Sequence, residues 1–304
     1  MTKQELTNLV AELLSQMHGE HEPMVKGSDY KTLVTEAPRE EKHHRPGDFV
    51  PDVTELNLRE LYLVEQAADP EKFRKMKLRT PARLGCGKAG ARYKTLTMLR
   101  FRADHAAAQD AVFSEMDAEF AKQHDLLPVK TRCDSKDEYL TRPDLGRCFD
   151  EHNAKTIQGV IDTPPRVQLV VGDGLSSAAI EANAADCLAA IRDGLKLKGI
   201  ETGKAIFVKY CRVGAGDAIG DITGCEVVCV LVGERPGLVT DKSMSVYITY
   251  KPHTGVSESS RTVVSNIHAQ GTPAVEAGAH IAELIDTILK KKVSGVGLHL
   301  EADV

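Results

Sequence analysis

The second half of the chain alternates between short, continuous apolar runs and longer stretches of helical composition. The apolar runs, which predict strands, cover residues 167–171, 205–213, 226–232 and 245–250. The helical stretches cover residues 178–198, 217–223 and 273–292. Strands without polar alternation are usually buried on both faces. This half therefore predicts a Rossmann-like, doubly wound and mostly parallel sheet with helices on both sides.

Residues 51–164 have a mainly helical pattern. The sequence Asp52-x-x-Glu55 predicts the start of a first helix that continues through the apolar positions of residues 56–64. Residues 104–122, rich in Ala, Glu, Gln and Met, predict the clearest helix of this region. Pro143 predicts the first turn of another helix. We therefore expect an α/β protein with a mainly helical N-terminal region.

The first residues predict a short amphipathic helix over 2–17. Its apolar residues recur at i, i+3 and i+4 spacing, and Thr2-x-x-Glu5 forms a capping box. Residues 19–50 are mostly polar and lack a sustained period, which is typical of a flexible linker. An isolated helix of this length is marginal in water, so it must either pack on its own domain or dock elsewhere.

Composition places the chain among ordinary soluble proteins, with 42% hydrophobic and 27% charged residues. Its seven cysteines have irregular spacings and form no CxxC pair, which gives little support to zinc and favours reduced, structural thiols in a cytosolic protein. We find no apolar run of the ~20 residues that a membrane span needs, and no secretory signal. No membrane association is expected.

Charge is distributed unevenly along the chain. Residues 72–102 hold eleven Lys or Arg and no carboxylate, although the net charge is −5. Solvated faces usually mix both signs, so this basic run predicts a surface for a negative partner. That partner can be a nucleic acid, a phosphate-bearing cofactor or an acidic subunit. The acidic total, the 5% aromatic content and the absence of Trp argue against nucleic acid, which stays as the alternative.

Three predicted strands end in unusual residues, which suggests a ligand crevice. These ends are Asp173 between two glycines, the sequence Arg212-Val213-Gly214, and residues 233–237. Ligands of open parallel sheets bind at the carboxyl ends of the strands, although Gly and Asp also end strands as ordinary turns. Residues 214–220 read GxGxxxG, one residue longer than a dinucleotide fingerprint, so nicotinamide or flavin binding is a minor alternative. No catalytic triad or dyad is evident.

Several longer sequences resemble the small subunit of ethanolamine ammonia-lyase over residues 50–297. They are RTPARLGCGKA (79–89), residues 99–113, DEYLTRPDLGR (137–147), DGLS (173–176), Ala182-Asn183, GERPGL (233–238), SNIH (265–268), GTP (271–273) and VEAGAHIAEL (275–284). The resemblance implies a non-autonomous subunit of an adenosylcobalamin-dependent lyase. That enzyme converts ethanolamine to acetaldehyde and ammonia by a radical mechanism. It also implies that the catalytic residues lie in the large subunit and none in this chain.

The resemblance places the cobalamin contacts on Val213, Glu234 and Val263. A backbone contact is expected at position 263, where some relatives have Cys. No metal ligand is expected from the protein, since the cobalt is held within cobalamin. The motif DxHxxG, by which some proteins supply a histidine to cobalt, is absent because Asp150-Glu-His152 leads to Lys155. Cobalamin is therefore expected to keep its own base as lower ligand.

The resemblance also implies an organisation of the chain and its partners. Residues 1–18 are expected to be a targeting helix, 19–50 a linker, 51–164 a region that docks on the large subunit, and 165–304 the Rossmann-like cobalamin-binding domain. Within the basic run, Arg79, Arg83 and Arg92 are hypothesised to pair with acidic groups of the large subunit. The expected assembly has six large and six small chains. By analogy, the N-terminal helix recruits it to the shell of an ethanolamine-utilisation microcompartment in the bacterial cytoplasm.

Overall fold

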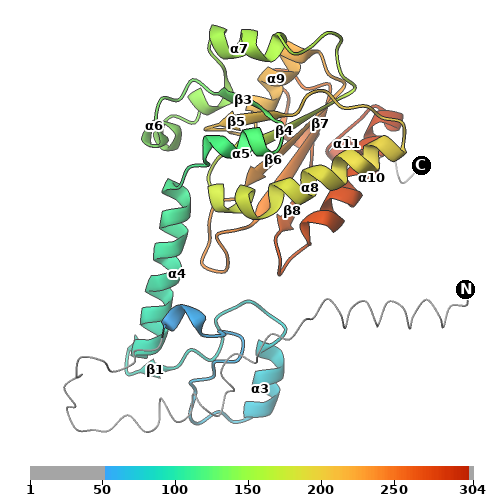
Figure 1. The fold of residues 1–304 in the computed structure, drawn as a ribbon. Coiled ribbons are helices and arrows are strands. Elements are labelled where there is room, and N and C mark those ends of the chain that lie inside the picture. The colour runs from blue at the N-terminus through green and yellow to red at the C-terminus, as the bar shows by residue number, and fades with distance from the viewer. Residues whose placement is uncertain (1–51, 301–304) are drawn as a thin grey trace, which may run out of the picture. The chain divides into compact units, whose positions relative to one another are not determined.

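The computed structural model describes residues 52–300, so the helix predicted at 2–17 and the linker at 19–50 lie outside the described residues. The chain forms two compact units, one that ends at Arg100 and one that begins at Phe101. The second unit contains a six-stranded sheet with helices on both of its faces (Figure 1).

The sheet has the strand order β3-β5-β4-β6-β7-β8. Its strands are β3 (Leu127–Lys130), β4 (Val167–Asp173), β5 (Ile206–Lys209), β6 (Val227–Gly233), β7 (Met244–Tyr250) and β8 (Arg261–Ile267). The first four in this order are parallel, and β7 and β8 are antiparallel to their neighbours. The predicted α/β class with a mostly parallel sheet is confirmed. β3 was not predicted, and it joins the sheet from the stretch predicted to be mainly helical.

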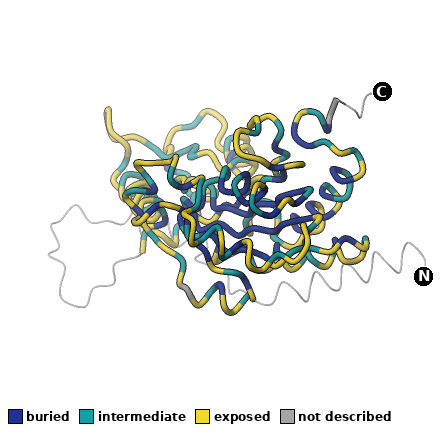
Figure 2. The backbone as a smooth tube through the Cα atoms, turned by 90° about the horizontal axis from the view of Figure 1, so that it is seen from above, coloured by how far each residue is buried: buried dark blue, intermediate teal, exposed yellow. Residues whose placement is uncertain are grey.

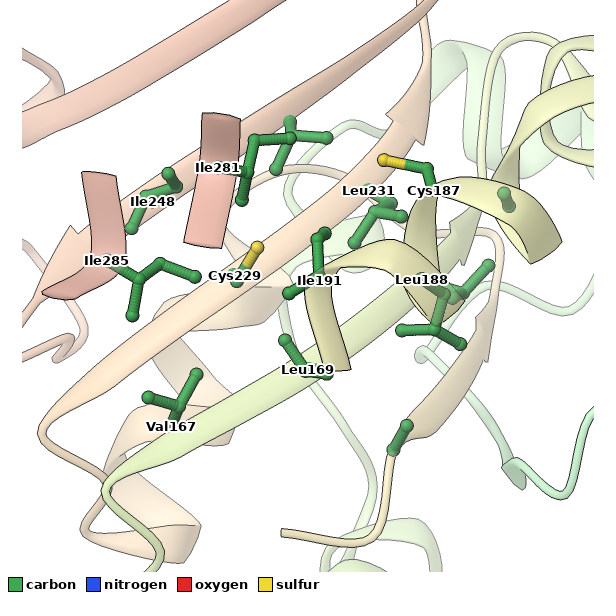
Figure 3. Packing of buried hydrophobic residues seen from close by; sticks show 14 of the residues in the cluster. Val167, Leu169, Cys187, Leu188, Ile191, Cys229, Leu231, Ile248, Ile281 and Ile285 are labelled. Atoms are coloured by element: carbon green, nitrogen blue, oxygen red, sulfur yellow. The ribbon is translucent and has the colours of Figure 1, made fainter. Parts of the chain in front are cut away.

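Alternating side chains of the strands build one hydrophobic cluster on each face of the sheet. On the first face, α8 (Ser177–Leu197) and α10 (Ala274–Lys291) cover residues such as Leu169 of β4 and Leu231 of β6 (Figure 3). On the second face, α7 (Glu151–Gln158) and α9 (Ala215–Thr223) cover Val170 and Val230. We call these the α8 face and the α9 face. Buried residues are concentrated along the strands between them (Figure 2).

Local signals fix where the sheet-covering helices begin and end. The Ser176 hydroxyl caps α8 by accepting a hydrogen bond from the backbone N–H of Ala179. Gly199, with φ of +68°, follows the end of α8, and Gly224, with φ of +65°, ends α9. A Cβ on Gly278 of α10 would lie 2.6 Å from the carbonyl oxygen of Cys187 in α8, so glycine permits the close packing of these two helices.

The helix predicted over residues 104–122 is two helices, α4 (Thr95–Phe113) and α5 (Ala118–Gln123). Residues 114–117 break it because tertiary contacts use their backbone. The N–H of Met116 donates to the Asp173 carboxylate, and the carbonyl of Ser114 accepts from Lys136. These partners lie far away in sequence, so helix propensity could not reveal the break.

Two other N-terminal predictions are wrong in detail. Only a single 3-10 turn, η1 (Val53–Glu55), forms where a longer helix was predicted. The Asn57 side chain accepts from the backbone N–H of Arg59, a local bond that competes with helix formation. Pro143 precedes a single 3-10 turn, η2 (Leu145–Arg147), and not a full helix.

The remaining elements are short. They are α3 (Pro70–Lys77), the two-residue strands β1 (Lys88–Ala89) and β2 (Arg92–Tyr93), α6 (Lys136–Thr141), η3 (Glu258–Ser260) and α11 (Val296–Leu300). The expected boundary between residues 164 and 165 lies inside the second unit, since β3 pairs with β5. Of the helices in residues 52–300, none combines the length and the apolar character that crossing a membrane requires.

Candidate cofactor site at the carboxyl edge of the sheet

The three strand ends that the sequence singled out meet at one edge of the sheet. β5, β4 and β6 are parallel neighbours, so their carboxyl ends lie side by side. This edge holds Asp173 at the end of β4, Val213 after β5 and Glu234 after β6. β7 begins and β8 ends at the same edge, because both run antiparallel to their neighbours.

The Glu234 carboxylate is held in a fixed position at this edge. Its Oε1 accepts hydrogen bonds from the Ser245 hydroxyl at 2.7 Å and from the backbone N–H of Asn266 at 2.9 Å. The Ser265 hydroxyl lies 2.9 Å from that of Ser245. The second oxygen, Oε2, has no hydrogen bond or ion pair with any residue in the described range of 52–300. Glu234 therefore offers one anchored oxygen and one available acceptor.

Asn266 directs its backbone N–H to Glu234 from an unusual conformation. Its φ is +63°, at the end of a register shift between β7 and β8. The loop that follows supports it. His268 Nε2 lies 2.8 Å from the Asn266 side-chain oxygen, and the N–H of Thr272 donates to the Asn266 carbonyl at 2.9 Å. Because the N–H of Gln270 donates to Nδ1 of His268, we assign a ring hydrogen to Nε2, which then donates to the Asn266 side-chain oxygen.

Val213 and Val263 lie on the α9 face of the sheet. Val263 is 44% exposed and pairs across the sheet with Tyr247, which packs against the cluster on the α9 face. Val213 packs against the same cluster at the start of α9. We call Val213, Glu234, Tyr247 and Val263 the shelf. Burial, and secondly the Glu234 carboxylate, raise the pKa of the Tyr247 phenol, so it is protonated at neutral pH.

A buried ion pair between Arg261 and Asp217 connects β8 to α9. The Arg261 guanidinium donates to both oxygens of Asp217 at 2.7 and 2.8 Å, and these two side chains are only 3% and 8% exposed. The pKa of Arg261 is raised, and the hydrogen bonds to Asp217 are the largest cause. Arg261 also pairs with Glu258 at 2.7 Å. Val263 follows two residues later on the same face of β8, so this pair helps to hold the strand that carries Val263.

Asp173 does not contribute to the shelf. It is 1% exposed, and its two oxygens bind the Ser177 hydroxyl at 2.6 Å and the N–H of Met116 at 3.0 Å. Both oxygens of this strand-end acid are therefore occupied by partners within the chain. Burial raises the pKa of Asp173 and lowers that of Lys136, whose ammonium donates to the carbonyls of Ser114 and Gly174.

The protonated form of Asp173 satisfies this buried network best. The Ser177 hydroxyl has one hydrogen but two acceptors, the Asp173 carboxyl at 2.6 Å and the Ser114 carbonyl at 2.8 Å. If the Asp173 carboxyl donates to Ser177, the serine hydrogen is available for Ser114 and every group has a partner. The network thus fastens residues 114–117 to the end of β4.

The glycines at this edge are explained by packing of the chain on itself. A Cβ on Gly233 would lie 2.2 Å from the carbonyl oxygen of Ser176, and one on Gly174 would lie 2.8 Å from that of Cys211. In the GxGxxxG sequence, a Cβ on Gly216 would lie 2.6 Å from Val230, and one on Gly220 would lie 2.4 Å from the carbonyl of Pro252. These glycines let α9 approach β6 and the Pro252 loop closely.

Comparison with known proteins decides the family. The family described as "Ethanolamine ammonia-lyase light chain (EutC)" matches residues 70–299. Two proteins named ethanolamine ammonia-lyase small subunit, from Clostridium perfringens and Clostridioides difficile, are each 54% identical to this chain. Both alignments cover 98% of this chain and 100% of the relative. A Listeria monocytogenes protein of the same name is 51% identical, with the same coverage. The chain belongs to the ethanolamine ammonia-lyase small-subunit family.

The structure of this small-subunit family member groups the predicted contact residues on one face. Val213 and Glu234 follow strands with clear sequence signals, whereas Val263 lies in an edge strand that we did not predict. Ser245, Asn266 and Tyr247 were missed, because their roles depend on the pairing of β7 with β8. Within residues 52–300, no three His, Cys, Asp or Glu side chains converge as a metal-binding group.

Proposed function

We propose that this chain is the small subunit of an adenosylcobalamin-dependent ethanolamine ammonia-lyase, which converts ethanolamine to acetaldehyde and ammonia. The shelf contacts one side of the cobalamin, and the large subunit encloses the rest. One observation supports this role above the others. Glu234 holds its carboxylate with Ser245 and Asn266 and keeps Oε2 available for a ligand.

The residues of the shelf fit the chemistry of a corrin. Its rim carries amide groups that donate hydrogen bonds, and an anchored carboxylate is a strong acceptor for them. Val213 and the exposed side chain of Val263 offer apolar contacts on the α9 face. β8 is an edge strand, so part of its backbone has no strand partner, which supports the expected backbone contact at Val263.

In this proposal the chain binds adenosylcobalamin and shields it from water, and none of its residues takes part in the reaction. When bound, adenosylcobalamin supplies the radical chemistry. Glu234 orients the cofactor, and the valines keep water from its edge. The reacting atoms of ethanolamine contact the large subunit, in an assembly of six large and six small chains. The N-terminal helix recruits this assembly to a microcompartment shell in the bacterial cytoplasm.

The test is reconstitution of the activity. This chain is mixed with a matching large subunit and adenosylcobalamin, and release of ammonia and acetaldehyde from ethanolamine is compared with that of each chain alone. Activity in the mixture alone supports the proposal. A complex without activity contradicts the proposed substrate, and the absence of any complex contradicts the subunit role.

A further inference from the structure

Helix α3 is anchored to its own unit by one side. The Phe73 ring packs against that of Tyr62 with centroids 5.6 Å apart. Lys77, one turn later, is 2% exposed, and its ammonium donates to the carbonyl of Leu84. Burial lowers the pKa of Lys77. The i, i+4 spacing of Phe73 and Lys77 places both on the same side of the helix, so the opposite side faces away from this unit.

The opposite side of α3 is basic around an apolar centre. Lys72, Lys75 and Met76 have i, i+3 and i+4 spacing, and Leu78 and Arg79 follow directly. All five are exposed, and the exposed fractions of Met76 and Leu78 are 53% and 55%. The three cations are Lys72, Lys75 and Arg79, and none of them forms an ion pair or a side-chain hydrogen bond with any described residue, 52–300. We call these five residues the α3 patch.

Other cations of the basic run have partners within the same unit. Lys94 pairs with Glu65 at 2.5 Å, and Arg100 donates to the carbonyls of Val53, Thr54 and Leu56. The Arg92 guanidinium donates to the carbonyl of Tyr93 at 3.2 Å. The side chain of Arg83 is half-buried. Of the three arginines hypothesised to pair with the large subunit, only Arg79 is exposed without a local partner among the described residues.

The unit that carries the α3 patch has little core of its own. Among residues 52–100, Leu63 is the only hydrophobic side chain that is buried. Tyr93 and Leu99 are exposed by 53% and 47% in addition to Met76 and Leu78. A segment that buries so little apolar surface gains little stability from it, and exposed apolar groups near cations are typical of an interface.

We infer that the α3 patch docks on an acidic surface of the large subunit, with Met76 and Leu78 entering an apolar pocket and the cations pairing around it. The inference rests on the proposed function, since it takes the large subunit as partner. The apolar centre favours a protein over a nucleic acid. A nucleic-acid surface would need aromatic side chains for stacking or an unbroken row of cations, and the patch has neither.

The test uses the full chain assembled with its large subunit. The triple variant Lys72→Glu, Lys75→Glu, Arg79→Glu is compared with a control triple, Lys196→Glu, Lys251→Glu, Lys292→Glu. The control makes the same change of charge at exposed residues of the second unit. Dissociation constants are measured by mass photometry at physiological salt. We expect the patch variant to weaken assembly at least ~100-fold and the control less than ~3-fold. Met76→Ala should weaken it ~10-fold with an unchanged salt dependence.

Several outcomes would overturn this inference. Equal dissociation constants for the two triple variants would do so, as would wild-type binding to duplex DNA that the patch variant loses. Circular dichroism and the unfolding temperature confirm that each variant is folded before it is compared. If the wild-type chain forms an active complex while the patch variant assembles normally, only the docking inference fails. If the wild-type chain forms no complex, the proposed function fails.

Discussion

At the scale of single residues, Glu234 has two separable roles, because its two oxygens have different partners. Oε1 is held by Ser245 and Asn266, which both donate hydrogen bonds. In Glu234→Gln, the amide oxygen can keep both of these bonds while the NH₂ group replaces Oε2. The substitution therefore removes the acceptor for the ligand and preserves the anchor. We expect the KM for adenosylcobalamin to rise ~10-fold or more, with little change in unfolding temperature.

Two further variants control for the anchor. Glu234→Ala removes both oxygens, so it should lower the stability of the chain as well as the affinity. Ser245→Ala removes one of the two hydrogen bonds that hold Oε1 of Glu234. It should raise the KM for adenosylcobalamin less than Glu234→Gln does. An unchanged KM in Glu234→Gln would mean that the second oxygen does not contact the cofactor.

Asp173 allows a pH-dependent test of the buried network. Because its folded pKa is raised above the unfolded value, its contribution to stability is full below the unfolded pKa and is lost as pH rises through the folded pKa. Asp173→Asn does not titrate and keeps the hydrogen bonds to Ser177 and Met116. Its unfolding free energy relative to wild type should therefore increase between about pH 4 and pH 7. Urea unfolding over this range checks the sign.

The alanine variant at the same position serves as the control. Asp173→Ala removes the hydrogen-bond partner of the Met116 N–H and one partner of the Ser177 hydroxyl. Its free energy of unfolding should therefore be about 1–3 kcal/mol lower than that of Asp173→Asn. A constant difference between wild type and Asp173→Asn over this pH range would show that folding does not raise the pKa of Asp173.

At the scale of elements, the pair Arg261–Asp217 connects an edge strand to a helix. Asp217→Asn leaves the Arg261 guanidinium buried without its main counter-charge, and we expect a loss of roughly 2–4 kcal/mol in unfolding free energy. Glu151→Gln breaks an exposed pair with Lys155 and should cost less than about 1 kcal/mol. Thermal and urea unfolding compare the two variants. Similar losses would show that the buried pair does not fasten β8 to α9.

The elements that the sequence predicted well are those with strong local signals. β4, β6 and α10 have long apolar runs or helical periods, so burial and local preference agree. β3 was missed because it has only four residues and includes a proline, and β8 because its edge position leaves several residues exposed. The break between α4 and α5 depends on Asp173, 57 residues from Met116.

The candidate site was also predictable only where its residues follow strands with strong local signals. Glu234 and Val213 could be found as strand ends, since parallel strands bring their carboxyl ends to one edge. Val263 came only from the resemblance to the family. The anchoring of Glu234 by Ser245 and Asn266 requires the register of β7 and β8, including its shift near Met244 and Val246, and no local pattern encodes that shift.

At the scale of the whole molecule, the proposed targeting role of the predicted N-terminal helix can be tested separately from activity. Deletion of residues 1–20 should leave the purified complex fully active and abolish its encapsulation in microcompartments. Deletion of residues 21–40, which lie in the predicted linker, should preserve encapsulation. Fluorescent fusions in cells and activity of the purified complexes measure both properties. Loss of activity in the first variant would assign the helix a structural role.

The shelf on the α9 face is proposed to contact cobalamin, and cofactor affinity after a bulky side chain is placed on the shelf tests this most directly. Val263→Arg places a long charged side chain there, whereas Val275→Arg makes the same change at a residue of α10 that is 58% exposed. Equilibrium dialysis of adenosylcobalamin with each assembled complex gives the dissociation constants. We predict at least ~10-fold weaker binding for Val263→Arg and wild-type binding for Val275→Arg. Equal affinities in the two variants would show that the shelf does not contact cobalamin.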